Sequence, residues 1–284
     1  MATDLGRRDR EGLPELRHQS VVKRVRALRG GRVVADSTAA VLVWEPRRVV
    51  ASYAVPEADV RADLVPVRDP LGDASTAAGT GILGGPPGGP PVLDPRVPFA
   101  VHTAPGTPLS VRVGDTVVEG AAYRLQDPDL AGLVVLDFAA FDWLDEDEPV
   151  VSHPRDPYHR IDVCRSGRTV RIASGGRLLA QSSRALWLFE GTFPFARHYL
   201  PHEDVAVPLV RDPSRVTACA YKGVATYWSV ADDPALAGIA WSYEDPLHDA
   251  EQVRGLVCFF TERLDVQVDG VPVPREATPW SEPD

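Results

Sequence analysis

Short apolar runs separated by turn residues recur along the whole chain. The runs at 41–44, 186–189, 226–230 and 256–260 are rich in β-branched and aromatic residues, a pattern typical of β-strands. Glycine pairs at 30–31 and 175–176 lie between apolar runs and predict tight hairpins. Only short helical turns are expected, at 56–59 and 201–204. The pattern therefore predicts an all-β fold of antiparallel strands, arranged as small sandwiches or open barrels.

Two parts of the sequence match each other. Residues 25–37 align with 170–182 at an offset of 145, which also pairs Glu45 with Glu190. Further along, Asp127-Pro128 matches Asp245-Pro246. We interpret this as a duplication, with a polar N-terminal tail at 1–19, a degenerate first repeat at 20–150 and a second repeat at 151–284.

The first repeat carries an insertion of about 28 residues between Val67 and His102. Its core is a Pro/Gly-rich loop at 71–98, which we expect to be flexible and to be cut first by proteases. The loop contains a literal GxGxxG at 79–84, but prolines and glycines follow it instead of a helix. A dinucleotide site needs that helix, so the cofactor, if there is one, stays unknown.

Composition narrows the classes of partner. The net charge of −10 argues against nucleic acid, whose binding depends on cationic side chains. No apolar run reaches the roughly 18 residues of a membrane span, and the N-terminus lacks the apolar stretch of a secretory signal. Three scattered cysteines fit a reducing, cytoplasmic compartment. We expect a small-molecule ligand, and the sequence leaves the oligomeric state open.

The second repeat concentrates chemically useful side chains. We predict Lys222 and Glu190 as the catalytic pair, and as ligand-binding residues Tyr199, Cys219, Tyr221, Tyr227, Trp241 and Tyr243. Aromatic walls with polar tips around one cation suit a concave binding site. In a strand Tyr227 and Ser229 share one face, while Trp228 and Val230 share the other. One of these two sets must therefore belong to the core.

Lys222 stands out because only two of the 30 basic residues are lysines. A lysine kept against that bias suggests a need for a compact ammonium, or for an amine whose pKa is lowered by desolvation. We therefore expect Lys222→Arg to impair function nearly as much as Lys222→Ala, with little loss of stability.

The first repeat lacks these side chains. Opposite Cys219 to Gly223 it has His102-Thr-Ala-Pro-Gly106, and opposite Tyr227-Trp228 it has Ser110-Val111. Glu190, in contrast, has a counterpart in Glu45. Presence in both repeats fits a structural hydrogen-bond acceptor as well as a catalytic group, and the two interpretations stay open.

A possible metal site precedes the second repeat. Four potential ligands recur at every third residue, namely His153, Asp156, His159 and Asp162. Pro154 and Pro157 would break the helix that brings such a series together. No metal site is therefore predicted.

The second repeat contains the motifs Cys219-Ala-Tyr-Lys-Gly223, Tyr227-Trp-Ser-Val230 and Trp241-Ser-Tyr243 with Asp245-Pro246. In these motifs it resembles a bacterial family known as domain of unknown function 427. It covers about 150–284 closely and 20–150 loosely. Ala220 and His198 depart from the family, which usually has proline and tyrosine there. The resemblance implies a β-tent-like fold, although the paired CxxC zinc ligands of many β-tent proteins are missing.

These observations lead to two main hypotheses. The first is a small-molecule-binding protein of unassigned chemistry, with or without catalysis, in which Lys222 and Glu190 converge in a closed pocket. The second is a binding or scaffold module that holds a peptide or protein partner on an exposed aromatic patch. A nucleotidyltransferase-like enzyme, suggested by one name used for the family, is a weaker alternative because no phosphate loop or acidic metal pair is present.

Overall fold

The computed structural model describes residues 2, 13–68, 92–93, 95–191, 195–276, 278 and 280–281. Most of the predicted Pro/Gly-rich loop, with its GxGxxG segment, lies outside the described residues. The chain forms two compact units, Met1–Asp156 and Pro157–Asp284. The boundary thus falls six residues after the predicted start of the second repeat at 151.

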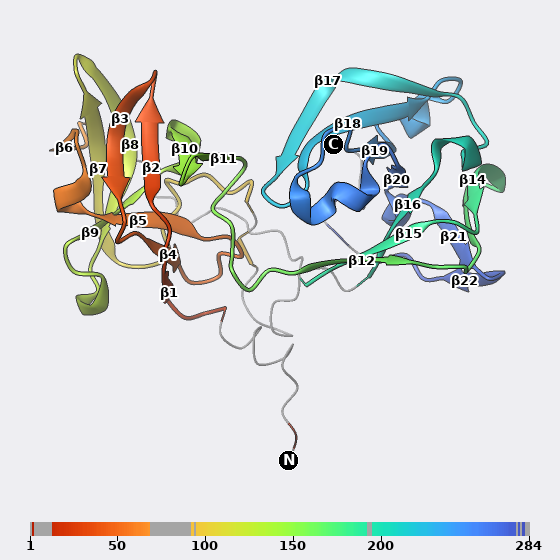
Figure 1. Cartoon of the computed structure of the whole chain (residues 1–284), viewed down its shortest axis with the longest axis horizontal. Coiled ribbons are helices and arrows are strands. Elements are labelled where there is room, and N and C mark those ends of the chain that lie inside the picture. The colour runs from red at the N-terminus through yellow and green to blue at the C-terminus, as the bar shows by residue number, and fades with distance from the viewer. Residues whose placement is uncertain are drawn as a thin grey trace. The chain divides into compact units, whose positions relative to one another are not determined.

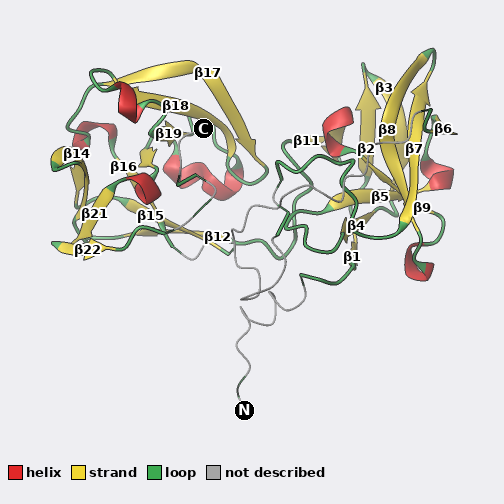
Figure 2. Ribbon diagram, turned by 180° about the vertical axis from the view of Figure 1, so that it is seen from behind, coloured by secondary structure: helices red, strands yellow, loops and turns green. Residues whose placement is uncertain are grey.

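Antiparallel strands dominate both units, as predicted (Figures 1 and 2). The first unit contains β1 (Arg17–Ser20), β2 (Val25–Arg29), β3 (Arg32–Ser37), β4 (Val41–Trp44), β5 (Ser52–Pro56), β6 (Asp63–Pro66), β7 (Gly106–Val113), β8 (Thr116–Leu125), β9 (Leu133–Leu136), β10 (Asp142–Asp145) and β11 (Glu148–Val150). Its short 3₁₀ turns are η1 (Glu57–Asp59), η3 (Pro128–Leu130) and η4 (Phe138–Ala140).

The second unit contains β12 (Ile161–Arg165), β13 (Val170–Ser174), β14 (Arg177–Ser182), β15 (Leu186–Glu190), β16 (Arg197–Leu200), β17 (Leu209–Cys219), β18 (Gly223–Val230), β19 (Ala240–Ser242), β20 (Val257–Phe259), β21 (Asp265–Val268) and β22 (Val271–Val273). Its 3₁₀ turns are η5 (His202–Asp204), η6 (Pro234–Leu236), η7 (His248–Val253) and η8 (Thr261–Arg263). Among the described residues no helix is long and apolar enough to cross a membrane.

The two units correspond strand for strand. Their seven-stranded sheets run β1-β4-β5-β9-β8-β7-β6 and β12-β15-β16-β20-β19-β18-β17, and their four-stranded sheets run β11-β10-β2-β3 and β14-β13-β21-β22. Strands β7 and β18 hold the same place and begin at Gly106 and Gly223. Glu45 directly follows β4, and Glu190 ends its counterpart β15. Both large sheets are open among the described strands.

The glycine pairs form the predicted hairpin turns. Gly30 and Gly31 have φ values of 54° and 76°, and Gly175 and Gly176 have 54° and 86°. Two successive positive φ angles define the type I′ turn, whose twist matches that of the strands it joins. The helical turns predicted at 56–59 and 201–204 appear as η1 and η5.

Two parts of the first unit differ from the predicted boundaries. Residues 17–19, assigned to a polar tail, belong to β1, which pairs with β4. Leu93, within the loop expected to be flexible, is fully buried and exchanges backbone hydrogen bonds with the segment 47–49. The buried Arg48 guanidinium donates to the carbonyls of Pro98 and Val101. Leu93 and Pro98, both within the predicted loop 71–98, therefore contact the body of the first unit.

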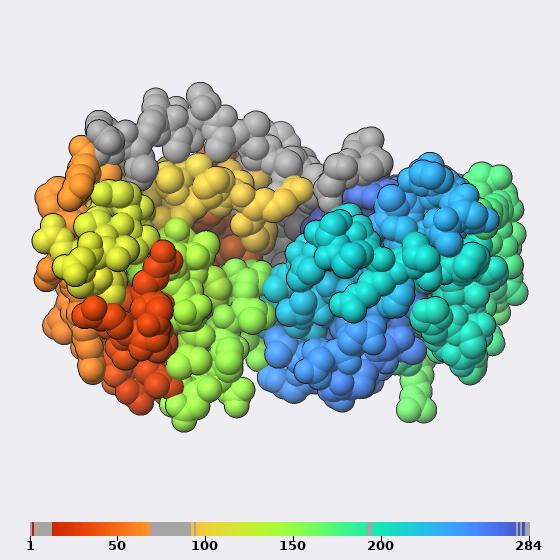
Figure 3. Space-filling view, turned by 90° about the horizontal axis from the view of Figure 1, so that it is seen from above, coloured from red at the N-terminus to blue at the C-terminus, as the bar shows by residue number. Residues whose placement is uncertain are grey.

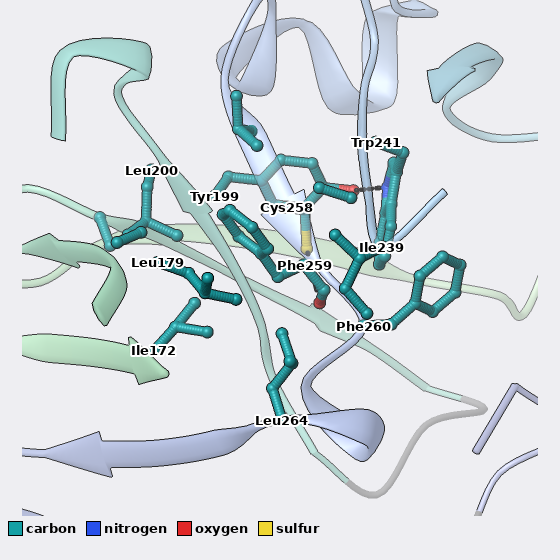
Figure 4. Packing of buried hydrophobic residues seen from close by; sticks show 14 of the residues in the cluster. Ile172, Leu179, Tyr199, Leu200, Ile239, Trp241, Cys258, Phe259, Phe260 and Leu264 are labelled. Carbon is teal, nitrogen blue, oxygen red and sulfur yellow. Dashed lines mark hydrogen bonds between the residues drawn. The ribbon is translucent and has the colours of Figure 1, made fainter. Parts of the chain in front are cut away.

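The core of the second unit lies on both faces of its large sheet. Leu200 and Phe259 on one face pack near Ile172 and Leu179 of the small sheet, and all four are fully buried (Figure 4). The opposite face carries Tyr199 and its aromatic neighbours. At the edge of the sheet, β17 exposes Val210 and Val216. The cyan surface of Figure 3 includes this strand.

Candidate functional site

Strand register places three of the predicted aromatic residues, Tyr199, Trp241 and Tyr227, in one line with Cys258. Tyr199 pairs with Cys258, Cys258 with Trp241, and Trp241 with Tyr227 across β16, β20, β19 and β18. Directly paired residues of antiparallel strands point to the same face of a sheet. These four residues, here called the cross-strand row, are each at most 7% exposed. The Trp241 indole N–H donates to the Tyr199 hydroxyl at 3.3 Å (Figure 4).

Glu190 reaches the same face from the end of β15. Leu186 pairs with Tyr199, and Leu186, Leu188 and Glu190 point to one face because strand side chains alternate. Leu188, on the same face two residues before Glu190, is fully buried, and its burial brings the carboxylate into the interior. The Glu190 side chain is only 6% exposed.

Lys222 arrives from the turn between β17 and β18. Cys219 pairs with Gly223 across that turn, and Gly223 has φ +94°, a conformation that favours glycine. A Cβ on Gly223 would also lie 3.2 Å from the Asp245 carbonyl oxygen. The backbone carbonyl of Lys222 accepts a hydrogen bond from the Leu247 amide. The glycine and this backbone contact fix the direction in which the lysine leaves the turn.

Glu190 and Lys222 form a buried ion pair. The Lys222 Nζ lies 2.7 Å from Oε1 and 2.6 Å from Oε2 of Glu190, and its side chain is 10% exposed. The predicted catalytic pair therefore converges. His159 adds a third group, because its Nε2 lies 3.1 Å from Glu190 Oε1 and its ring stacks on Tyr221 at 3.9 Å.

The ion pair keeps both partners charged. Burial alone would raise the pKa of Glu190, but the Lys222 ammonium and His159 lower it to about 2. Burial alone would lower the pKa of Lys222, but the Glu190 carboxylate holds it above its ordinary value. The expectation of an amine with a lowered pKa is therefore wrong: desolvation acts on Lys222, and the adjacent carboxylate outweighs it. Of the two explanations given for a lysine at this position, the need for a compact ammonium is the one that remains.

The phenols near this pair stay protonated. Burial raises the pKa of Tyr199 and of Tyr243 well above the ordinary value, and it raises the pKa of Cys258 to about 12. Cys219 is partly exposed and lies near enough to Lys222 and Tyr243 to influence both pKa values. The structure thus gathers the predicted residues around the Glu190–Lys222 ion pair, with the phenols of Tyr199 and Tyr243 neutral.

A family model described as "Domain of unknown function (DUF427)" matches residues 162–270. These residues belong to the DUF427 family. The match includes Glu190, Lys222 and the cross-strand row, but not His159. A search of curated proteins finds none that matches the chain.

The first unit builds a related cluster at the position equivalent to Glu190 of the DUF427 unit. Glu45 Oε1 lies 2.8 Å from Nδ1 of His102, and Oε2 accepts the backbone N–H groups of Thr103 and Ala104. The His102 ring stacks on Tyr123 at 3.4 Å. The carboxylate is present in both units, whereas the groups that form hydrogen bonds or ion pairs with it differ.

His159 and His102 are the residues that sequence reasoning missed. His159 was considered only as a metal ligand, in the segment 153–162, and His102 only as the residue opposite Cys219. Among the described residues no group of three or more His, Cys, Asp or Glu side chains could hold a metal ion. Neither histidine is near its carboxylate in the sequence, and the two do not occupy equivalent positions, so the spacing gave no signal for these contacts.

His198, the departure from the DUF427 pattern, lies on the other face of β16. It pairs with Trp187 across the strands, and the two rings meet edge to face at 4.6 Å. Its Nδ1 is buried without a hydrogen-bond partner. Burial, with Arg197 and Arg168 nearby, lowers its pKa to about 4. This residue is therefore separate from the Glu190 cluster.

Proposed function

We propose that the DUF427 unit binds a small polar molecule at the Glu190–Lys222 pair, with the surrounding tyrosines as hydrogen-bonding walls. The observation that carries the proposal is the convergence of Glu190 and Lys222 beside the cross-strand row. An ion pair joins the end of β15 to the β17–β18 turn at 2.6–2.7 Å, and the cross-strand row lies on the same face.

The energetics of buried charge support this proposal. Replacing a buried ion pair by apolar residues is often neutral or stabilising, so stability alone does not require Glu190 and Lys222. The pair is also close to the surface on one side, since Cys219 near Lys222 is partly exposed. A ligand therefore needs to displace little structure to reach the ion pair.

Burial of the aromatic residues favours a small molecule over a peptide partner. Tyr199, Tyr227 and Trp241 are 0%, 7% and 7% exposed, so they form no open aromatic surface for another chain. Binding walls of this kind suit a ligand that is enclosed by the site.

A ligand screen with a charge-free variant tests the proposal. Wild type and Glu190→Gln/Lys222→Met are compared by thermal shift against a metabolite library. The double substitution keeps the side-chain sizes similar and leaves no unpaired buried charge. Lys23→Met is the control, because Lys23 lies in the first unit, where it is half exposed and pairs with Asp145. We expect compounds that stabilise wild type and Lys23→Met to have no effect on the double variant. Equal stabilisation of all three proteins would reject the site.

A further inference from the structure

Each unit places a histidine ring against its strand-end glutamate and a tyrosine face. In the second unit His159 contacts Glu190 at 3.1 Å and stacks on Tyr221 at 3.9 Å with an interplanar angle of 23°. In the first unit His102 contacts Glu45 at 2.8 Å and stacks on Tyr123 at 3.4 Å with an angle of 6°. In each unit one nitrogen of the histidine ring contacts Oε1 of the glutamate.

The two histidines come from different places in the fold. His159 precedes β12, at the start of its unit, whereas His102 precedes β7. The glutamates are equivalent between the units, but the histidines are not. His102 also uses Nδ1 where His159 uses Nε2. The shared feature is therefore the ring itself, held by a carboxylate and an aromatic face, and not the way in which the ring is attached to the chain.

The charges around Glu190 define what such a site accepts. Lys222 contacts both carboxylate oxygens, and a second buried cation of this face, Arg197, forms a bidentate pair with Glu262. Because both cations already contact carboxylates, an anionic group gains little here. A ring N–H donor, in contrast, adds a hydrogen bond to Glu190 Oε1.

His159 lies in a segment that can yield its place. Residues 157–160, between the unit boundary and β12, contain no strand or helix. The neighbouring Tyr158 side chain is largely exposed. Moving residues 157–159 exposes Glu190 and Tyr221 and leaves intact both the β12–β15 pairing and the hydrogen bond from the Gly191 amide to the Arg160 carbonyl.

We propose that Glu190 and Tyr221 form a binding site for a planar nitrogen heterocycle with an N–H donor, and that His159 occupies it as an internal ligand. This proposal rests on the proposed function. It specifies the class of ligand, and it adds that His159 inhibits ligand binding by occupying the site. An external ring must compete with His159, so removal of the His159 side chain raises the affinity for such rings.

Imidazole binding to the full-length chain tests this. Wild type, His159→Ala and His159→Ala/Glu190→Gln are titrated with imidazole, with thiophene as a planar ring that lacks an N–H. We expect His159→Ala to bind imidazole at least tenfold more tightly than wild type does, to bind thiophene weakly, and to lose the gain when Glu190 is also replaced. His102→Ala, the matched variant of the first unit, should gain imidazole affinity in the same way.

Several results would overturn the proposal. They are an unchanged imidazole affinity in His159→Ala, equal affinities for imidazole and thiophene, or a gain that persists without Glu190. If His159→Ala does not fold, NMR of wild type gives the answer, because imidazole should then produce saturable shifts at His159 and Tyr221, and their absence rejects the site. If library compounds still require the Glu190–Lys222 pair while imidazole fails, the proposed function stands and only the ligand class and the role of His159 are wrong.

Discussion

Both lysines of this arginine-rich chain contact buried carboxylates. Lys222 contacts Glu190, and Lys23 lies 2.8 Å from Asp145, whose side chain is 10% exposed. Arginine also fills such a position, since Arg197 binds Glu262. The geometry differs, because Arg197 uses two nitrogens, whereas one Lys222 nitrogen reaches both carboxylate oxygens. A compact ammonium therefore fits where a planar guanidinium needs more room.

Substitution of Lys222 should reduce both stability and ligand binding. Lys222→Ala leaves Glu190 buried without its cation, which costs about 3–5 kcal/mol. Lys222→Arg keeps the charge but not the size, so we expect a smaller loss of stability and a similar loss of binding. The pairing of Lys222 with a buried carboxylate is the reason to expect a larger loss of stability than the sequence suggests. Urea unfolding of both variants, with Lys23→Ala as the control, measures the difference, and a fully stable Lys222→Ala would contradict the importance of the pair.

His198 should make the protein sensitive to mild acid. Its pKa in the folded protein is about 4, below the ordinary 6.5, so the unfolded chain binds the proton more readily. Stability is then full above pH 6.5 and falls as the pH drops towards 4, by about 3 kcal/mol in all. His198→Tyr, which introduces the usual residue of the family, should flatten the unfolding free energy over this range. His248→Tyr, at a side chain that is 75% exposed, should not, and equal slopes in the two variants would contradict the assignment.

At the scale of the element, the β17–β18 turn positions the cluster. Its glycine combines a positive φ with a close backbone neighbour, and the residue before it is Lys222. The equivalent glycine in the first unit, Gly106, starts β7 where a Cβ would collide with Tyr123 and the Arg124 carbonyl. Both positions therefore require glycine, for different local reasons.

Gly223→Ala should cost more than a glycine substitution in a hairpin turn. Gly30 also has a positive φ, but a Cβ there would meet nothing within 4 Å. We expect Gly30→Ala to lose about 1–2 kcal/mol from backbone strain alone. Gly223→Ala should lose more, because its Cβ also presses on the Asp245 carbonyl, and it should weaken ligand binding by moving Lys222. Chemical denaturation of the two variants provides the comparison, and equal losses would show that the Asp245 contact is unimportant.

At the scale of the whole molecule, each unit contains a full set of strands and its own core. The large apolar clusters of the first and second unit share no residue, and strand pairing stays within each unit. Both units hold a carboxylate at the same place in the sheet, but only the second surrounds it with Lys222 and the cross-strand row.

Separation of the two units should leave two folded proteins. Cutting the chain near Ser152, before the unit boundary at Asp156, keeps His159 with the second unit. We expect both halves to unfold cooperatively, and compounds found in the screen to bind only residues 153–284. Circular dichroism and thermal shift on the two fragments test this. A second half that folds only in the presence of the first would contradict the independence of the units.

The sequence by itself determined the strands, the hairpins and most members of the cluster. Short apolar runs and glycine pairs are local signals, and they predicted β4, β15 and the turns at 30–31 and 175–176 correctly. Composition also singled out Lys222. These features depend on residues that are close together in the sequence, which is why a single sequence reveals them.

Only the tertiary structure decided how the cluster is closed and charged. Whether burial or Glu190 controls the pKa of Lys222 depends on a separation of 2.6–2.7 Å across 32 residues of sequence. The contacts of His159 and His102 with their glutamates likewise join distant segments, and no periodicity announces them. The strength of a buried electrostatic interaction depends on distance and on exclusion of water, and both are properties of the folded chain.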